Sequence, residues 1–311
     1  MIEHLPHIIR SDRLEHGRRE SEAVRRGVER GEFVRVRRGA AVDAAAWRAA
    51  SSRDRHLILV LAVMPRLASR MVVSHASAAA CWELPALGEW PSRVHVVDPD
   101  RRTTQTTANV VRHPGPLSGE EVRSLPPLSL TSPARTAAEL ALTSSFRDAV
   151  VALDALVRRG LATVDDVRHV LDGRGSARGL PSARRAVAFA TPEAESPGES
   201  LTRVVLHELG APPPVLQQRF TWGDGGLFAD VVDFWWPRFG VVLEFDGRIK
   251  YAEGRWKKGR SPGQVVVDEK IREDRIRNRP EVNGFARTVW DELSHPPRLA
   301  ANLRSAGLPL P

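Results

Sequence analysis

The sequence contains a single cysteine, Cys81, which excludes both an internal disulfide and a metal site built from several cysteines. It also lacks a long apolar run, because the longest, from Leu57 to Met64, is too short to span a bilayer. The first residues carry His, Glu and Arg instead of the apolar core of a signal peptide. We therefore expect a cytoplasmic protein without a membrane partner.

Lysine is scarce, since the chain has 42 arginines and only four lysines. The formal net charge of +8 and the pI of about 10.7 favour a polyanionic partner, with DNA as the first choice, although the base composition of a gene can also enrich arginine. All four lysines fall between residues 250 and 270. A compact ammonium is not equivalent to a planar guanidinium, so this segment is predicted to need lysine chemistry.

The 311 residues, 42% of them hydrophobic and 27% charged, are typical of a globular protein with two or three domains. The predicted fold class is α/β (α+β). We expect a basic module over 1–56, a small α/β domain over 57–172, a linker with a short helix over 173–189, and a second α/β domain over 190–311.

The first 60 residues are the most basic part, with 13 arginines against nine acidic residues. Residues 21–30 are predicted to form a short helix, and residues 32–42 alternate apolar and basic side chains around Gly39, which is typical of a two-stranded wing. A helix followed by a basic wing is what a winged helix-turn-helix presents to DNA. The predicted DNA contacts are Arg25, Arg26, Arg30, Arg35, Arg37 and Arg38. The alternative is an ordinary solvated helix and hairpin.

Three short motifs continue this region: RVRRG at 35–39, SHASAA at 74–79 and TSPART at 131–136. Over about residues 20–160 the chain resembles the AbiEi-type antitoxin proteins of type IV toxin–antitoxin systems. The resemblance implies a winged-helix module, a small α/β domain and a partner toxin. His75 could be catalytic, but a lone histidine at a helix start is more often a structural hydrogen-bonding group, and we prefer that interpretation.

Two short apolar strands are predicted over 231–236 and 241–245, joined by a turn at 237–240. A turn centred between residues 238 and 239 places Asp233 directly opposite Glu244, about 5 Å away on the same face. Strand alternation adds Asp246 to that face. Opposed like charges are destabilising, so a divalent cation is expected there. The alternative is that the carboxylates are solvated or paired with arginines.

Five motifs flank and include this hairpin: ESPGES at 195–200, VVDFWWP, VVLEFDG, the following KY, and EKIRED at 269–274. Over about residues 190–295 they resemble the Vsr-like (very-short-patch-repair-type) endonuclease domains of the PD-(D/E)XK superfamily. The resemblance implies a mixed sheet flanked by helices and Mg²⁺ (or Mn²⁺) between Asp233 and Glu244. We expect the Phe245 carbonyl and, from its place on the same face of the hairpin, Asp246 as further ligands. The resemblance also implies that Glu199 helps to bind the metal or its water, although Glu199 could simply cap its helix.

The sequence departs from this pattern at one position. The superfamily places a lysine two residues after the Glu, and Asp246 stands there. The ammonium is then expected from Lys250, just beyond the hairpin, or from Lys270 on the predicted helix over 266–277. Between them, Arg255, Lys257 and Lys258 are expected to clamp phosphates from a polar loop.

These observations predict a Mg²⁺-dependent DNA endonuclease that hydrolyses phosphodiester bonds and is brought to DNA by the N-terminal arginines. The resemblances imply a phage-defence or toxin–antitoxin setting. The alternative is a non-catalytic, antitoxin-like DNA-binding regulator whose nuclease fold has lost activity, and Asp246 favours it.

Overall fold

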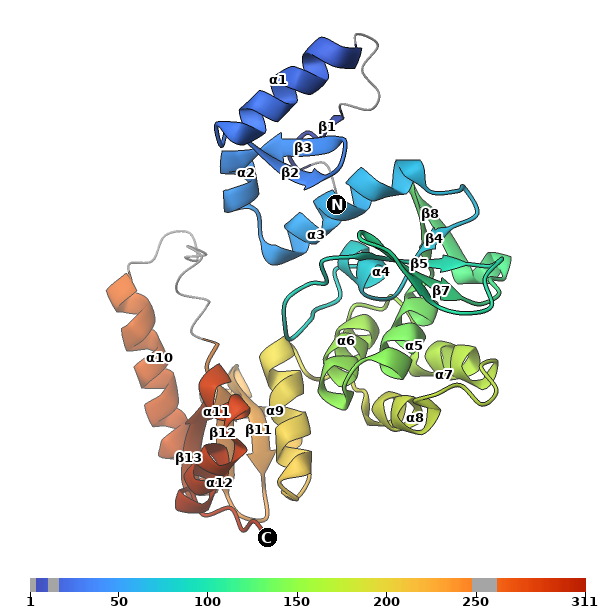
Figure 1. Cartoon of the computed structure of the whole chain (residues 1–311). Helices are drawn as coiled ribbons and strands as arrows, with labels where there is room; N and C mark the ends of the chain where they lie inside the picture. The colour runs from blue at the N-terminus through green and yellow to red at the C-terminus, as the bar shows by residue number, and fades with distance from the viewer. Residues whose placement is uncertain (1–3, 11–16, 248–261) are drawn as a thin grey trace. The chain divides into compact units, whose positions relative to one another are not determined.

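The computed structural model describes residues 4–10, 17–247 and 262–311. The chain forms two compact units, Met1–Ala190 and Thr191–Pro311 (Figure 1). The described part is a mixed α/β structure with three sheets, which confirms the predicted fold class at this level. No helix in the described ranges has the length and apolar character needed to cross a membrane.

The first unit begins with a small antiparallel sheet in the order β1-β3-β2. Helix α1 (Gly17–Glu29) precedes the hairpin of β2 (Phe33–Arg37) and β3 (Ala40–Asp43), so the predicted helix and two-stranded hairpin are confirmed. The pairing of β1 (Ile9–Arg10) with β3 was not predicted. Asp43 then caps α2 (Ala44–Ala49) by accepting a hydrogen bond from Ala46 N.

A six-stranded mixed sheet follows in the order β6-β7-β5-β4-β9-β8. Its strands are β4 (Val72–Val73), β5 (Val94–Asp98), β6 (Gln105–Thr106), β7 (Val110–Pro114), β8 (Val122–Leu125) and β9 (Leu128–Thr131). Helices α3 (Ser52–Val63) and α4 (His75–Cys81) pack on it and bury an apolar core with the strands. The helix expected in the TSPART motif is α5 (Pro133–Thr143), which Ser132 caps.

Three more helices complete this unit: α6 (Phe146–Arg158), α7 (Val164–Asp172) and α8 (Leu180–Phe189). Helix α8 packs against α5, α6 and α7. The short helix of the predicted linker segment therefore belongs to the first unit, which ends at Ala190.

The second unit contains a four-stranded mixed sheet in the order β10-β11-β12-β13. Its strands are β10 (Val215–Trp222), β11 (Phe228–Trp236), β12 (Val241–Phe245) and β13 (Gly284–Thr288), and only the β12–β13 pair is parallel. Its helices are α9 (Pro197–Glu208), α10 (Pro262–Arg277), α11 (Trp290–Ser294) and α12 (Pro296–Ser305).

The sheet of this unit lies between α9 and α10 (Figure 1). Gly198 of α9 packs so closely on Phe245 that a Cβ atom would lie 2.0 Å from the ring. From α10, Ile276 joins an apolar cluster with Val242, and Arg272 binds Glu244. Since side chains alternate along β12, the two helices cover opposite faces of the sheet.

Candidate functional site

The hairpin of β11 and β12 brings together the two acidic residues expected to form a site. Phe234 pairs with Leu243 and Trp236 with Val241, so Asp233 and Glu244 lie just beyond the paired residues of β11 and β12. The Asp233 carboxylate accepts a hydrogen bond of 2.7 Å from the Phe245 backbone N–H. Asp233 and Glu244 are thus near neighbours, whereas their direct pairing across the two strands stays a prediction.

Glu199, in the first turn of α9, is the third acidic residue of this group, after Asp233 and Glu244. One carboxylate oxygen of this buried residue accepts from the Ser196 hydroxyl at 2.7 Å. The other accepts from Glu195 N at 2.8 Å and from the Gln217 amide at 2.9 Å. The Glu199 N–H in turn donates to the Ser196 hydroxyl, so Ser196 caps the helix. Glu199 also adds negative charge beside Asp233.

Asp246 does not join this group in the way that strand alternation predicted. Strand β12 ends at Phe245, one residue before Asp246, and the Asp246 N–H is hydrogen-bonded to the Thr288 carbonyl of β13. Within the described ranges, no three or more His, Cys, Asp or Glu side chains are placed to hold a metal ion together. The predicted carboxylate triad of Asp233, Glu244 and Asp246 is therefore wrong.

The surroundings of Asp233 change its acidity. Burial, together with the charges of Glu199 and Glu244, raises the pKa of Asp233 to about 7, although the Phe245 N–H and Arg272 act in the opposite direction. At neutral pH this carboxyl group therefore binds a proton about half of the time. A carboxyl group with such a pKa loses its proton readily when a metal ion binds to it.

The cation closest to the pair is Arg272 of α10. Its Nη2 donates to Glu244 Oε1 at 2.6 Å and also to the Val231 carbonyl. Arg287 on β13 lies farther off, with its Nη2 3.9 Å from Glu244 Oε2. Glu244 is thus paired with an arginine, which is the alternative to a divalent cation that the sequence left open.

Lys270 points away from the acidic pair. Its side chain is 62% exposed and its ammonium lies 3.0 Å from Asp274 on the same helix. Residues two positions apart in an α-helix are separated by about 200° around its axis, so Lys270 and Arg272 face nearly opposite directions. The surface ion pair is the ordinary alternative for this lysine. The other expected cations, Lys250, Arg255, Lys257 and Lys258, lie outside the described residues.

The basic N-terminal surface is smaller than predicted. Arg37 is buried, and its guanidinium donates to the carbonyls of Ala62 and Arg38. The register of β2 and β3 shifts between Arg35 and Arg37, so the simple alternation that assigned Arg37 to the exposed wing fails there. Arg30 is hydrogen-bonded to Glu32, and Arg25 lies 3.9 Å from Glu29. Of the predicted contacts, Arg25, Arg26, Arg30, Arg35 and Arg38 are exposed.

Replacing Arg35 and Arg38 together by Ala should weaken DNA binding and reduce its salt dependence. Two lost phosphate contacts lower the slope of log affinity against log salt by about 2. Fluorescence anisotropy with a labelled duplex at several salt concentrations measures this slope. The matched change is Arg37→Ala, which should destabilise the hairpin and leave the slope of the folded protein unchanged. An unchanged slope in the double variant would contradict a role of this hairpin in DNA binding.

A stack of three histidines is buried in the first unit. The rings of His75 and His113 are 3.7 Å apart between centroids, and His95 Nδ1 lies 2.9 Å from His113 Nε2. Burial lowers the pKa of both His75 and His113 to about 3, so these rings are neutral at pH 7. The His75 ring is hydrogen-bonded to the Ser74 hydroxyl, and the His75 backbone N–H donates a hydrogen bond to the Glu139 carboxylate. These contacts match the structural role that we preferred for His75.

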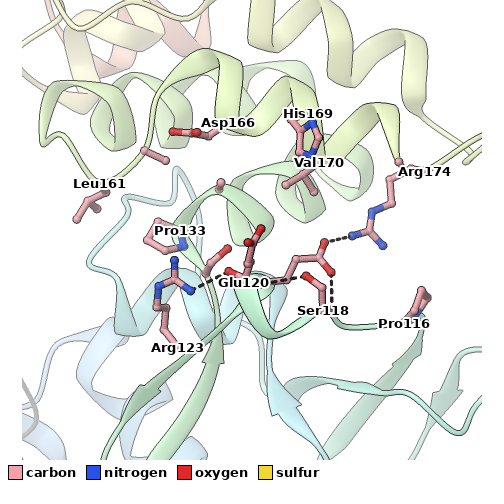
Figure 2. Close-up of a pocket in the computed structure, with 15 residues that line it drawn as sticks. Pro116, Ser118, Glu120, Arg123, Pro133, Leu161, Asp166, His169, Val170 and Arg174 are labelled. Atoms are coloured by element: carbon pink, nitrogen blue, oxygen red, sulfur yellow. Dashed lines mark hydrogen bonds and ion pairs between the residues drawn. The ribbon is translucent and has the colours of Figure 1, made fainter.

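The first unit also has a pocket of about 660 Å³ beside the N-terminus of α5 (Figure 2). At its wall, Glu121 accepts hydrogen bonds from Ser118 N, Arg135 and Arg174. Asp166 and His169 of α7 lie across the pocket from η2 (Gly119–Glu121). Its lining contains none of the predicted site residues, and its acidic and basic groups largely compensate one another, so it indicates no particular ligand.

Comparison with known proteins gives limited information. No family model matches the chain. It is 28% identical over 193 residues to two uncharacterized proteins of Mycobacterium tuberculosis, MT2308 of strain CDC 1551 / Oshkosh and Rv2248 of strain ATCC 25618 / H37Rv. The alignment covers 58% of this chain and 69% of each relative.

Among solved structures, the chain is similar to the Rv2827c protein of Mycobacterium tuberculosis. The TM-score is 0.37 and the sequence identity 17%, over 63% of this chain and 75% of the other. That score is below the level at which two chains share a fold. The acidic pair and its surroundings therefore carry the functional argument.

Proposed function

We propose that this protein is a Mg²⁺-dependent DNA endonuclease whose second unit is a Vsr-like member of the PD-(D/E)XK superfamily. The observation that carries the proposal is the proximity of Asp233 and Glu244 on adjacent strands, with Glu199 as a third acidic group beside them. Such a concentration of carboxylates on a largely apolar hairpin is costly unless a cation compensates it.

The donor groups fit a hard divalent cation. Asp233, Glu244 and the Phe245 carbonyl offer oxygen ligands, and Mg²⁺ in proteins is often held by only one or two carboxylates together with water. Asp233 and Glu244 would hold the ion, and the proton on Asp233 would leave as it binds. When bound, such an ion supplies a water of lowered pKa and a charge that stabilises the phosphate.

The chain's own residues would supply the remaining functions. Glu199 is fixed by four hydrogen bonds and keeps the charge beside Asp233 in place. Exposed arginines of the first unit, such as Arg35 and Arg38, would hold the phosphate backbone without reading sequence. They would do so as part of a winged-helix-like module in an AbiEi-like region, in a defence or toxin–antitoxin setting with a partner toxin.

Nicking of supercoiled plasmid DNA tests the proposal. The full chain should nick the plasmid with Mg²⁺ and not with EDTA, and Glu244→Gln should lower the rate on the order of 100-fold or more, because one of two metal-binding carboxylates is lost. The matched control is Asp230→Asn, because Asp230 is also an acidic residue of the hairpin but pairs with Arg275. Equal nicking by wild type and Glu244→Gln would contradict the proposal.

A second candidate is a non-catalytic DNA-binding regulator. Two observations favour it: Asp246 stands where the superfamily has lysine, and Arg272 already binds Glu244. Salt-sensitive DNA binding without any nicking, at every divalent cation tested, is the result that this candidate predicts.

A further inference from the structure

Arg272 contacts the atom that a metal ion would need. Its Nη2 lies 2.6 Å from Glu244 Oε1, and the carboxylate it binds is 11% exposed. A Mg²⁺ ion bound to the same oxygen would stand about 2 Å from it, next to the guanidinium. The two cations would compete for the charge of one carboxylate, and they repel one another in a partly buried place.

Arg272 is also placed to remain nearby after it leaves Glu244. The side chain is 29% exposed, and its guanidinium is additionally anchored to the Val231 carbonyl on β11. Glu244 would keep the more distant Arg287 as a neighbour, and Arg287 has a carboxylate of its own in Glu273, at 2.9 Å. Of these two arginines, Arg272 makes the shorter contact and is the one whose partner a metal would take.

We propose that Arg272 and a divalent cation occupy Glu244 in turn: the guanidinium holds the carboxylate in the metal-free protein, and metal binding releases it toward the phosphate of the DNA. This inference rests on the proposed function. Arg272 then has two roles: it binds Glu244 when no metal ion is present, and it contacts a DNA phosphate when the metal ion is bound. A planar fork of N–H donors matches a phosphate bidentately, which suits arginine better than lysine for the second role.

The exchange explains why the hairpin tolerates its carboxylates without metal, and why an arginine on α10 faces the site while Lys270 faces solvent. The exchange also weakens metal binding, because a metal ion must displace the hydrogen-bonded guanidinium of Arg272 before it binds Glu244. Removing that charge should therefore tighten metal binding even though it removes a residue needed with DNA.

Calorimetric titration of Mn²⁺ into the metal-free full chain tests the exchange. Arg272→Ala should bind Mn²⁺ at least about tenfold more tightly than wild type, and Arg272→Gln, which retains a hydrogen-bond donor, should change affinity in the same direction. Arg275→Ala is the matched control, since Arg275 lies on the same helix but binds Asp230 through two hydrogen bonds of 3.0 Å. Its Mn²⁺ affinity should equal that of wild type.

Equal or weaker Mn²⁺ binding by both folded Arg272 variants would overturn the exchange and leave the proposed metal site intact. Absence of binding in wild type and both variants would overturn the metal site and the exchange with it. A second readout concerns the phosphate contact: with Ca²⁺ in place of Mg²⁺, Arg272→Ala should bind a DNA duplex more weakly than Arg275→Ala does. Equal DNA affinities of these two variants would contradict a phosphate contact by Arg272.

Discussion

Replacing Arg135 by Ala should destabilise the first unit by about 3–5 kcal/mol, because it breaks a buried ion pair and leaves one partner without compensation. Arg135 is 3% exposed, and its Nε donates to Glu139 Oε1 at 2.8 Å. Its Nη1 donates to Glu121 at 2.9 Å. Burial raises the pKa of Glu139 while Arg135 opposes that rise, so the variant must either bury an unpaired charge or take up a proton.

Hydrogen exchange of the amides in α5 and α6 measures the stability of this unit separately from the second one. The matched change is Arg174→Ala, which removes the other arginine that binds Glu121 but lies nearer to the surface. It should cost about 1 kcal/mol. A loss of less than about 1 kcal/mol in Arg135→Ala would mean that Glu139 finds another partner or water.

Replacing Asp233 by Asn should stabilise the metal-free second unit at pH 8, by about 1–3 kcal/mol. The pKa of Asp233 is raised to about 7 in the folded chain, against an ordinary value of 3.8. Between these two values the folded state binds more protons than the unfolded state, so stability falls as the pH rises from about 4 to 7 and is level above. Asparagine keeps an oxygen that can accept from Phe245 N and carries no charge.

Urea unfolding at pH 4, 6 and 8 in EDTA, followed by hydrogen exchange in β11 and β12, measures this difference. Wild type and variant should be equally stable at pH 4, where Asp233 is protonated in the folded state, and should separate as the pH rises. Asp230→Asn provides the contrast, because it weakens a paired carboxylate and should destabilise at pH 8. A destabilised Asp233→Asn at pH 8 would contradict the raised pKa of Asp233.

Local rules predicted the elements that hold the candidate site. The turn over 237–240 fixes the register in which Phe234 pairs with Leu243 and Trp236 with Val241, and this register brings Asp233 near Glu244. The capping of α9 by Ser196 follows from the spacing of Ser196 and Glu199 and from Pro197 at the first helical position. Both depend on residues close together in the chain.

The errors concern contacts between distant segments. Arg272 lies 28 residues from Glu244, and its place in the EKIRED motif does not show that its side chain reaches Glu244. Of the two lysines expected to supply an ammonium, Lys250 lies outside the described residues, and Lys270 is two positions from Arg272 on the other side of the helix. Arg37 was assigned to the surface by an alternation that a strand irregularity interrupts. His75, His95 and His113 come from three separate segments, so their stacking could not be foreseen.

The central claim is that Asp233 and Glu244 hold a divalent cation. The most direct measurement is calorimetric titration of Mn²⁺ into the metal-free full chain at pH 8, with wild type and Asp233→Asn side by side. The account predicts one saturable site per chain in wild type that is absent from the variant, which lacks the charge but keeps the fold. Equal binding by both proteins, or no binding by wild type, would contradict it.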